Sequence, residues 1–394
     1  MSNKNYTGNK FLTNKNMTEG EKRRLFDFKH IQLELRRKEL ENRIAREEFE
    51  AKLQQDTRKM MKKAKKAAKK AAFDVRYAYV AGGHFKNELL GFLTVFNLNR
   101  STKVRTIHNI RYDENDKRMY LNIYERKDRD RSQKAKVFVY IHGGGWIGGY
   151  PATREGFTTR IAEKGYFVIS IYYGEAPQYS HPKMIQNVYK AFAWLRTHAE
   201  EYNIDVDEIY VGGESAGAHL SAMAGAIATN PEYNALFDLD ERSRHQRICG
   251  LVLNCGVYDM EKATTTGFKN IGIYTQSYCG GVEVKYLGDD NKKQISPIYW
   301  VTKDFPPTFA ISGENDKLAI LTFDFVKELY DKGVYIDHYH AQGRFAVHAF
   351  AVIQVLKITK IAMQGIYDFL SRLNSKPVGK KNKKRKQNRT ETEV

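Results

Sequence analysis

The sequence predicts an α/β fold, in which a mostly parallel central sheet is flanked by helices and joined by a helical cap and a long basic N-terminal helical extension. From about residue 104 onwards, short β-branched runs alternate with helical patterns, which is typical of a parallel sheet covered on both faces. One of these runs, Ile209–Val211, leads through a glycine-flanked turn into a helix of small residues. The 394 residues are 42% hydrophobic and 12% aromatic, which is enough for a large core.

The first 72 residues are predicted to form an extension. Residues 1–17 are polar, and we expect them to be disordered. Thr18-Glu19-Gly20-Glu21 matches a capping box, and a helical pattern follows it to about Ala72. The apolar positions of this pattern are sparse and drift around the helix, so a coiled coil is not predicted. Residues 73–103 are richer in apolar and aromatic side chains, and we expect them to form cap helices over the functional site.

Residues 104–373 are predicted to form the main domain. Two alternating runs, Val104–Tyr112 and Arg118–Tyr124, predict a hairpin. A stretch at about 257–300 interrupts the later alternation of strands and helices, and we expect it to be a second cap element. The other strands are expected at Lys136–Ile141, Phe167–Tyr172, Glu208–Val211, Gly250–Asn254, Thr308–Ser312 and Val334–His340. The helices are expected at about Tyr150–Lys164, Lys183–Tyr202, Ala216–Thr229, Leu318–Lys332 and His348–Leu373.

The net charge of +19 belongs to the two ends of the chain. Residues 1–72 hold 21 Lys and Arg against 10 Asp and Glu, and residues 374–394 hold 8 against 2, so the middle is nearly neutral. We expect the tail at 374–394 to be disordered. The lysine-rich helix end Lys62–Lys70 and this tail have two interpretations: solvated charge, or contact with an anionic membrane surface or a nucleic acid.

The cysteine usage and the N-terminal residues favour a reducing compartment. The three cysteines, Cys249, Cys255 and Cys279, lack C-x-x-C spacing, so neither a disulfide framework nor a zinc site is predicted. The residues after Met1 contain no apolar run typical of a signal peptide. We therefore expect a cytoplasmic protein, with peripheral membrane contact through the basic segments as the open alternative. No sequence pattern indicates an oligomeric state.

Two glycine-rich segments are predicted to carry the chemistry. Gly213-Glu214-Ser215-Ala216-Gly217 matches G-x-S-x-G between a strand and a helix, which is the context of a nucleophile elbow. A side chain at either flanking glycine would crowd the neighbouring strand and helix. Upstream, His142-Gly143-Gly144-Gly145-Trp146 directly follows a strand, and its glycines allow backbone amides to face a developing negative charge. Nucleotide binding is poorly supported, because no lysine follows these glycines and G-x-G-x-x-G is absent.

A nucleophilic serine also needs a base and an acid, which follow it in the chain in this strand–turn–helix context. Asp316 comes shortly after the strand that precedes the last one, and His348 comes after the last strand. Asp259, which also follows a strand, is the rival acid. Three other histidines fit less well as the base. His338 and His340 lie within the last strand, and His219 is expected to pack under the elbow, one helical turn after Ser215.

These motifs, in this order, resemble the hormone-sensitive-lipase family of α/β-hydrolases over about residues 104–372. The resemblance rests on the two glycine-rich segments, on Asp316 with Leu318, and on His348 with Phe350. It implies an α/β-hydrolase fold. It also implies a serine ester hydrolase that acts on short- to medium-chain acyl esters of small molecules through an acyl-enzyme intermediate. It also implies that Ser215 is the nucleophile, His348 the base and Asp316 the acid that orients the base.

The resemblance assigns further residues to the site. It implies an oxyanion hole formed by the backbone amides of Gly144, Gly145 and Ala216. It also implies substrate contacts from the segments around them, and no metal or organic cofactor. The expected substrate-binding residues are His142, Gly143, Trp146 and Glu214.

One segment departs from the family pattern. The family usually has Tyr-Arg-x-Ala-Pro-Glu where this chain has Tyr173-Gly174-Glu175-Ala176-Pro177-Gln178, so the arginine and the final glutamate of the pattern are both missing. An ion pair between them cannot form here, and the substrate class is therefore open. An aryl-formamide or amide substrate on the same triad is one alternative, and a binding or scaffold protein without turnover is the other. Residues 1–72 match nothing in the family.

Overall fold

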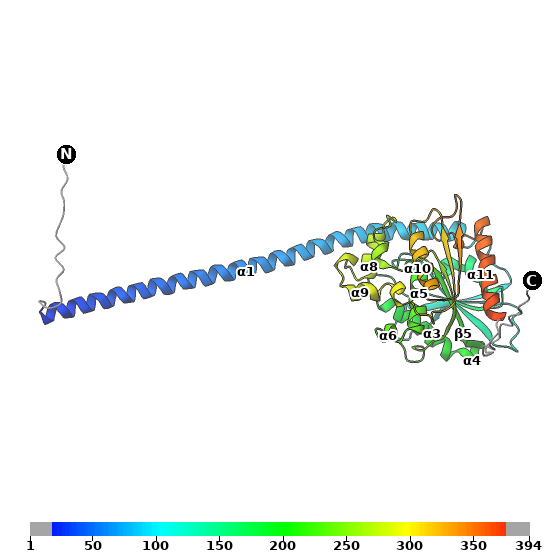
Figure 1. Cartoon of the computed structure of the whole chain (residues 1–394), viewed down its shortest axis with the longest axis horizontal. Helices are drawn as coiled ribbons and strands as arrows, with labels where there is room; N and C mark the ends of the chain where they lie inside the picture. Colours follow the sequence, from blue (N-terminus) through cyan, green and yellow to red (C-terminus); the bar gives the residue numbers. More distant parts are fainter. Residues whose placement is uncertain (1–17, 376–394) are drawn as a thin grey trace, which may run out of the picture. The chain divides into compact units, whose positions relative to one another are not determined.

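The computed structural model describes residues 18–375, and these fall into two units. Residues 18–72 belong to one unit and residues 73–375 to the other. Figure 1 shows the course of the chain with its helices and strands labelled. The disorder predicted for residues 1–17, and for the basic tail beyond Ser375, lies outside the described residues.

Helix α1 runs from Glu19 to Gly91, so its predicted end at about Ala72 was wrong. The predicted capping box is present: Thr18 N–H donates to the Glu21 carboxylate at 2.9 Å, and Glu21 N–H donates back to the Thr18 hydroxyl at 3.3 Å. Residues 73–91 contain no proline that would break the helix. Every described side chain between residues 18 and 72 is exposed.

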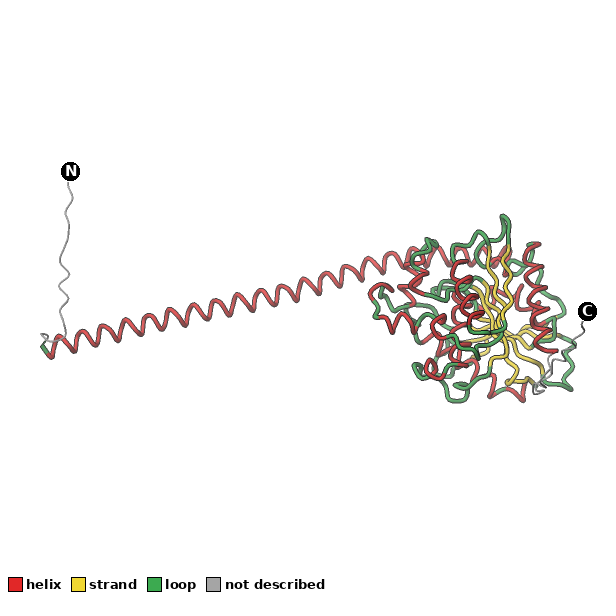
Figure 2. The backbone as a smooth tube through the Cα atoms, viewed as in Figure 1, coloured by secondary structure: helices red, strands yellow, loops and turns green. Residues whose placement is uncertain are grey.

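The described residues of the second unit form one eight-stranded sheet with the order β1-β2-β4-β3-β5-β6-β7-β8. Strand β2 is antiparallel to both of its neighbours, β1 and β4, and all later neighbours are parallel. Figure 2 shows these strands, in yellow, as a twisted sheet enclosed by helices. The strands are β1 (Val104–Arg111), β2 (Tyr120–Arg126), β3 (Ala135–Ile141), β4 (Phe167–Ile171), β5 (Ile204–Glu214), β6 (Ile248–Asn254), β7 (Thr308–Gly313) and β8 (Ile336–Ala341).

Side chains that alternate along the strands build a hydrophobic core on each face of the sheet. In β3, Val137 and Val139 join the core that also contains residues of α3 (Lys183–Thr197), α5 (Ala216–Thr229) and α10 (Ala319–Asp331). Phe138 and Tyr140 point to the other core, which contains residues of α2 (Glu155–Ala162) and α11 (Lys357–Ser375). The short helices are α4 (Ala199–Tyr202), α6 (Pro231–Asn234), α7 (Met260–Ala263), α8 (Ile271–Tyr278) and α9 (Asp289–Gln294). The carboxyl ends of the parallel strands therefore lie at one edge, where loops can meet.

Two helix predictions were wrong, and the first of them concerns the candidate base His348. The helix expected at His348–Leu373 begins only at Lys357, because Ala349 has a left-handed backbone with φ of +54° and no helix can run through it. His348 is therefore on a loop. The helix expected at Lys183–Tyr202 is broken at His198 into α3 and α4.

The cap segments have the following structure. Helix α1 is followed by a five-residue π-helix at Phe92–Phe96, and the insertion between β6 and β7 contains α7, α8 and α9. The Tyr77 hydroxyl donates to the carbonyl of Ala176 at 2.7 Å, and the Asn97 amide donates to the carbonyl of Ala152 at 2.9 Å. Residues 73–97 are thus attached to the loops near the glycine segment after β3. None of the helices among the described residues is both long enough and apolar enough to cross a membrane.

Candidate active site

Ser215 lies in a sharp turn between β5 and α5. Its φ of +54° and ψ of −118° lie outside the regions that non-glycine residues usually occupy, so the turn is strained. Its N–H donates to the carbonyl of Asn254 at 2.8 Å. A Cβ on Gly213 or Gly217 would lie only 2.1 or 1.9 Å from the carbonyl oxygen of Ile141. The turn therefore requires glycine on both sides of the serine.

Two loops bring His348 and Asp316 to the Ser215 hydroxyl. Nε2 of His348 lies 2.9 Å from Oγ of Ser215, and Nδ1 lies 2.9 Å from Oδ2 of Asp316. Asp316 follows β7, is buried, and accepts a second hydrogen bond from Leu318 N–H at 2.9 Å. When the carboxylate is ionised, the Nδ1–H donates to it, and Nε2 can accept the serine proton. This chain of contacts can activate a hydroxyl for nucleophilic attack.

The Asp316 carboxylate is held in its ionised form by its surroundings. Burial by itself raises the pKa of Asp316, but the charge of His348 and the hydrogen bonds from His348 and Leu318 bring that pKa below its ordinary value. The buried thiol of Cys255 also lies beside this carboxylate, and burial raises the pKa of Cys255 well above its ordinary value, with Asp316 adding to the effect. The thiol is therefore protonated and can donate to Asp316.

Cys255, Asp316 and His348 form the single cluster of possible metal ligands found between residues 18 and 375, with ligand atoms within 4.8 Å of one another. Both ring nitrogens of His348 already contact Asp316 and Ser215. A metal ion bound here would have to replace one of these contacts. The donor set therefore fits a hydrogen-bonded triad better than a metal centre.

The loop after β3 and the start of α5 contain backbone amides without acceptors among the described residues. Gly144 and Gly145 have φ of +127° and +59°, and a Cβ on Gly144 would lie 2.0 Å from the carbonyl oxygen of Gly148. Within the described part of the chain, the N–H groups of Gly144, Gly145 and Ala216 have no acceptor. Ala216 is the first residue of α5, where backbone N–H groups lack partners in the helix. These three amides can therefore donate to a bound oxygen.

The side chains of His142 and Trp146 lie behind this loop. Nδ1 of His142 lies 2.8 Å from the carbonyl oxygen of Gly143, and its ring stacks on Tyr173 at 4.5 Å. Burial lowers the pKa of His142 to about 4, so the neutral ring donates through Nδ1–H. Trp146 Nε1–H donates to Nδ1 of His219 at 3.3 Å, and both side chains are fully buried. The structure places these side chains as supports of the loop and away from solvent.

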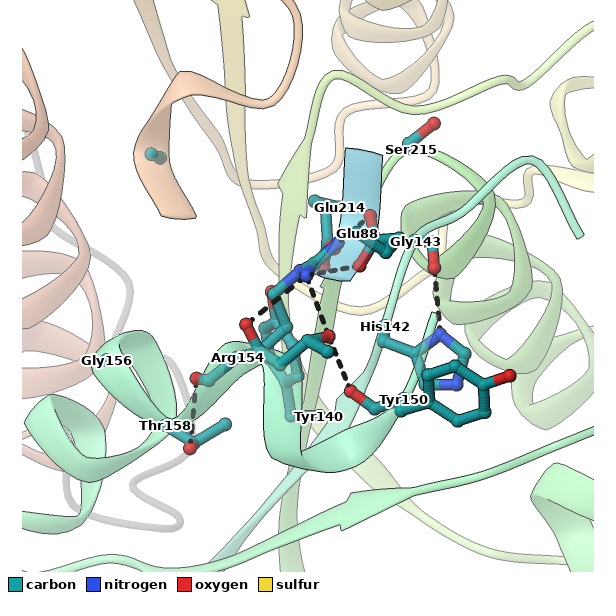
Figure 3. A network of polar contacts seen from close by, with 12 residues as sticks. Glu88, Tyr140, His142, Gly143, Tyr150, Arg154, Gly156, Thr158, Glu214 and Ser215 are labelled. Atoms are coloured by element: carbon teal, nitrogen blue, oxygen red, sulfur yellow. Dashed lines mark hydrogen bonds and ion pairs between the residues drawn. The ribbon is translucent and has the colours of Figure 1, made fainter. Parts of the chain in front are cut away.

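Glu214 belongs to a buried polar network that includes Arg154, Glu88 and Tyr140 (Figure 3). Its carboxylate accepts a hydrogen bond from Nε of Arg154 at 2.6 Å and another from the Tyr140 hydroxyl. Arg154 also donates to both carboxylate oxygens of Glu88 at 2.9 and 3.0 Å, and its guanidinium lies 4.5 Å from the Phe96 ring. The network therefore ties the end of α1 and the π-helix to the residue directly before Ser215.

The insertion between β6 and β7 adds two aromatic rings to the site. Phe268 contacts the His348 ring edge to face at 4.7 Å. Tyr274 of α8 lies against the glycine loop, since a Cβ on Gly145 would be 2.8 Å from its ring. The sequence analysis missed both residues, as well as Cys255 and the two partners of Glu214, because none of them belongs to a local pattern. Only the position of Cys255 directly after a strand was a usable signal.

The remaining candidates are held by other contacts. The Asp259 carboxylate caps α7 by accepting from Lys262 N–H at 3.0 Å, and the Tyr299 hydroxyl donates to it at 3.2 Å. His338 and His340 both contact the Ser312 hydroxyl, at 2.9 and 2.8 Å. None of these three side chains contacts Ser215 or His348 in the described structure.

Comparison with protein families gives one match, to the BD-FAE family, over residues 121–323. This range is about half of the chain. It contains Ser215 and Asp316 and ends before His348.

Curated relatives are esterases. Esterase LipQ of Mycobacterium tuberculosis is 28% identical over 276 residues, which are 68% of this chain and 63% of that protein. An acetyl esterase of Salmonella typhi is 31% identical over 191 residues, which are 46% of this chain and 55% of that protein. The chain thus spans less than two thirds of the length of these relatives.

Solved structures with the same fold are also esterases. Esterase B from Lactobacillus rhamnosis has a TM-score of 0.67 at 20% identity, and the match covers 79% of this chain and 97% of that one. A bacterial heroin esterase has a TM-score of 0.60 at 20% identity, over 75% of this chain and 92% of that one. These similarities show the predicted α/β-hydrolase fold.

Proposed function

Because the chain belongs to the BD-FAE family, we propose that it is a carboxylesterase that hydrolyses esters through an acyl-enzyme formed on Ser215. The observation that carries this proposal is the continuous contact from Ser215 through His348 to Asp316, beside backbone amides that lack acceptors. The esterase relatives support the same reaction.

The proposed reaction has two halves. The Ser215 hydroxyl attacks the ester carbonyl while Nε2 of His348 takes its proton, and Asp316 stabilises the imidazolium that forms. His348 then gives this proton to the leaving alcohol, and water repeats the attack on the acyl-enzyme.

The oxyanion hole is proposed to consist of the N–H groups of Gly144, Gly145 and Ala216. Each donor that faces the developing negative charge contributes about 3–4 kcal/mol to lowering the barrier. In this proposal, the side chains of His142, Trp146 and Glu214 hold the loop and the elbow in place, and they act on the substrate only indirectly.

We propose short- to medium-chain acyl groups as substrates. The rings of Phe268 and Tyr274 limit the space beside His348 and Gly145. An acetyl esterase among the relatives agrees with a small acyl group. Turnover of p-nitrophenyl esters from acetate to palmitate measures this preference, and a maximum at palmitate would contradict it.

Labelling with a fluorophosphonate probe tests the nucleophile. We expect the wild type to be labelled and Ser215→Ala to be neither labelled nor active. The matched control is Ser221→Ala, which removes a buried hydroxyl that donates to the Gly217 carbonyl in the same helix. This control should still be labelled. Labelling that persisted in Ser215→Ala would place the nucleophile elsewhere.

A further inference from the structure

A pocket of about 310 Å³ lies between the last turns of α1 and the residues that follow the glycine loop. Its polar lining consists of Tyr77, His84, Glu88, Tyr150 and Glu175. The volume is at the lower end of the range for small-molecule sites. No lysine or arginine lines the pocket among the described residues. The chemistry of the pocket is therefore that of carboxylates and aromatic rings.

The two carboxylates in this pocket differ in their partners. Glu88 is neutralised by the two hydrogen bonds from Arg154. Glu175, in contrast, has no cation beside it, and its Oε1 is fully buried without a hydrogen-bond partner among the described residues. Gly174 stands where the family pattern has an arginine, so the neighbouring chain offers no cation either. A buried carboxylate oxygen without a partner is costly, and a cationic ligand would remove that cost.

Aromatic rings surround this carboxylate. Tyr77 is fixed by its hydrogen bond to the carbonyl of Ala176, the residue after Glu175. The Tyr150 ring stacks on Tyr172 at 5.8 Å with an interplanar angle of 8°. Burial, the charge of Glu175 and a hydrogen bond with the Glu175 carboxylate raise the pKa of Tyr150 to about 12, so the two side chains are in contact. Burial also raises the pKa of Glu175, which reflects the cost of its charge in this pocket. Aromatic faces beside a carboxylate attract organic cations, because the ring faces and the carboxylate are both negative.

The imidazole of His84 belongs to the pocket lining and contacts a ring near the proposed catalytic centre. Burial lowers the pKa of His84, so its ring is neutral at neutral pH and does not repel a cation. The ring lies edge-on to Tyr274, with centroids 6.2 Å apart, and Tyr274 lies against Gly145. His84 and Tyr274 thus connect the pocket lining to the glycine loop through ring contacts.

We propose that this pocket binds the ammonium group of a small organic cation, with Glu175 as the counter-ion and the Tyr77 and Tyr150 rings as its walls. The cation has two possible sources. It is either the alcohol part of the ester substrate or a separate ligand. The first possibility rests on the proposed function, and the second does not.

Choline and its uncharged analogue 3,3-dimethylbutan-1-ol are the probes, since they have nearly the same shape and differ in charge. We expect choline to bind the full-length protein at least about tenfold more tightly than the alcohol in isothermal titration calorimetry. Glu175→Gln and Tyr150→Leu should each weaken choline binding about tenfold. The control Glu163→Gln removes a carboxylate that pairs with Arg160 outside the pocket, and it should not change choline binding.

The esters of these two alcohols identify the source. A higher kcat/KM for acetylcholine than for 3,3-dimethylbutyl acetate, with the preference reduced in Glu175→Gln, places the cation on the substrate. Choline binding with equal kcat/KM for the two esters indicates a separate ligand. Choline binding without hydrolysis of either ester or of any p-nitrophenyl ester from acetate to palmitate would overturn the esterase proposal and leave the cation site standing. Choline binding that is no tighter than that of the alcohol, or that persists unchanged in both Glu175→Gln and Tyr150→Leu, overturns the cation site.

Discussion

Replacing Arg154 by methionine is expected to be one of the most damaging single changes in the catalytic unit. The guanidinium is only 4% exposed and lies between Glu88 and Glu214, which are 8% and 2% exposed. Methionine fills much of the same volume but carries no charge. The change therefore leaves two carboxylates buried without a cation.

The structure sets the size of this effect. Removing one partner of a buried ion pair costs about 3–5 kcal/mol, because the remaining charge has lost its compensation. Two uncompensated carboxylates place Arg154→Met at about 4 kcal/mol or more. Glu88→Gln is expected to cost only about 1–3 kcal/mol, since Arg154 keeps its bond to Glu214 and the amide oxygen can still accept.

Urea unfolding of the full chain, followed by tryptophan fluorescence, measures both free energies. Arg160→Met is the matched control, because Arg160 lies on α2, which begins directly after Arg154, and pairs with Glu163 near the surface. A partly exposed pair of this kind, within one turn of a helix, is worth about 0–1 kcal/mol. The reasoning is refuted if Arg154→Met costs no more than Arg160→Met, or if Glu88→Gln costs as much as Arg154→Met.

Three further predictions follow from the site and the two units. Asp316→Asn is expected to lower kcat on p-nitrophenyl acetate by about 10⁴-fold through loss of the correct tautomer, while Asp259→Asn changes it little; the reverse order would assign the acid to Asp259. The free energy of unfolding is expected to fall by about 3 kcal/mol for each of two histidines as the pH drops from about 6.5 to 4, because burial lowers the pKa of His142 to about 4 and that of His219 to about 3 and the unfolded chain therefore takes up protons first. Thermal unfolding across this range should show a weaker pH dependence in His219→Gln, and an unchanged dependence would contradict this origin. Deletion of residues 1–72, a unit of their own, is expected to keep turnover of a short soluble ester; loss of turnover would show that the extension helps to build the cap.

The order of strands and helices and the turn at Ser215 could be predicted from the sequence, because both depend on residues that are close in the chain. The strand before Ser215, the small helix after it, and Gly213 and Gly217 together determine a local backbone path. The glycines of the loop at Gly144 and Gly145 likewise indicate the positive φ values that the structure shows. Helix ends were predicted less well: α1 passes Ala72 without a break because no local stop signal is present there.

The sequence predicted Asp316 as the acid, with Asp259 as the rival, because the family resemblance includes Asp316 with Leu318. Both residues follow strands, so their places in the chain do not by themselves show which carboxylate lies beside His348. The sheet order places β7 beside β8, so that the loop with Asp316 meets the loop with His348, whereas Asp259 is used to cap α7. Which carboxylate contacts His348 therefore depends on which strands are neighbours in the sheet, and strand pairing is a long-range contact.

The buried ion pairs and the pocket were decided entirely by the tertiary structure. Arg154 contacts Glu88 and Glu214 across 66 and 60 residues of chain, and no local periodicity encodes such a pairing. Glu175 looks like any loop carboxylate in the sequence, and it acquires its unusual environment only when Tyr77 and Tyr150 are packed around it. The sequence by itself determined the backbone conformations that short-range sterics and propensities control. The packing of distant segments determined which polar groups were buried together, because the cost of burying a charge depends on its neighbours in space and not on its neighbours in the chain.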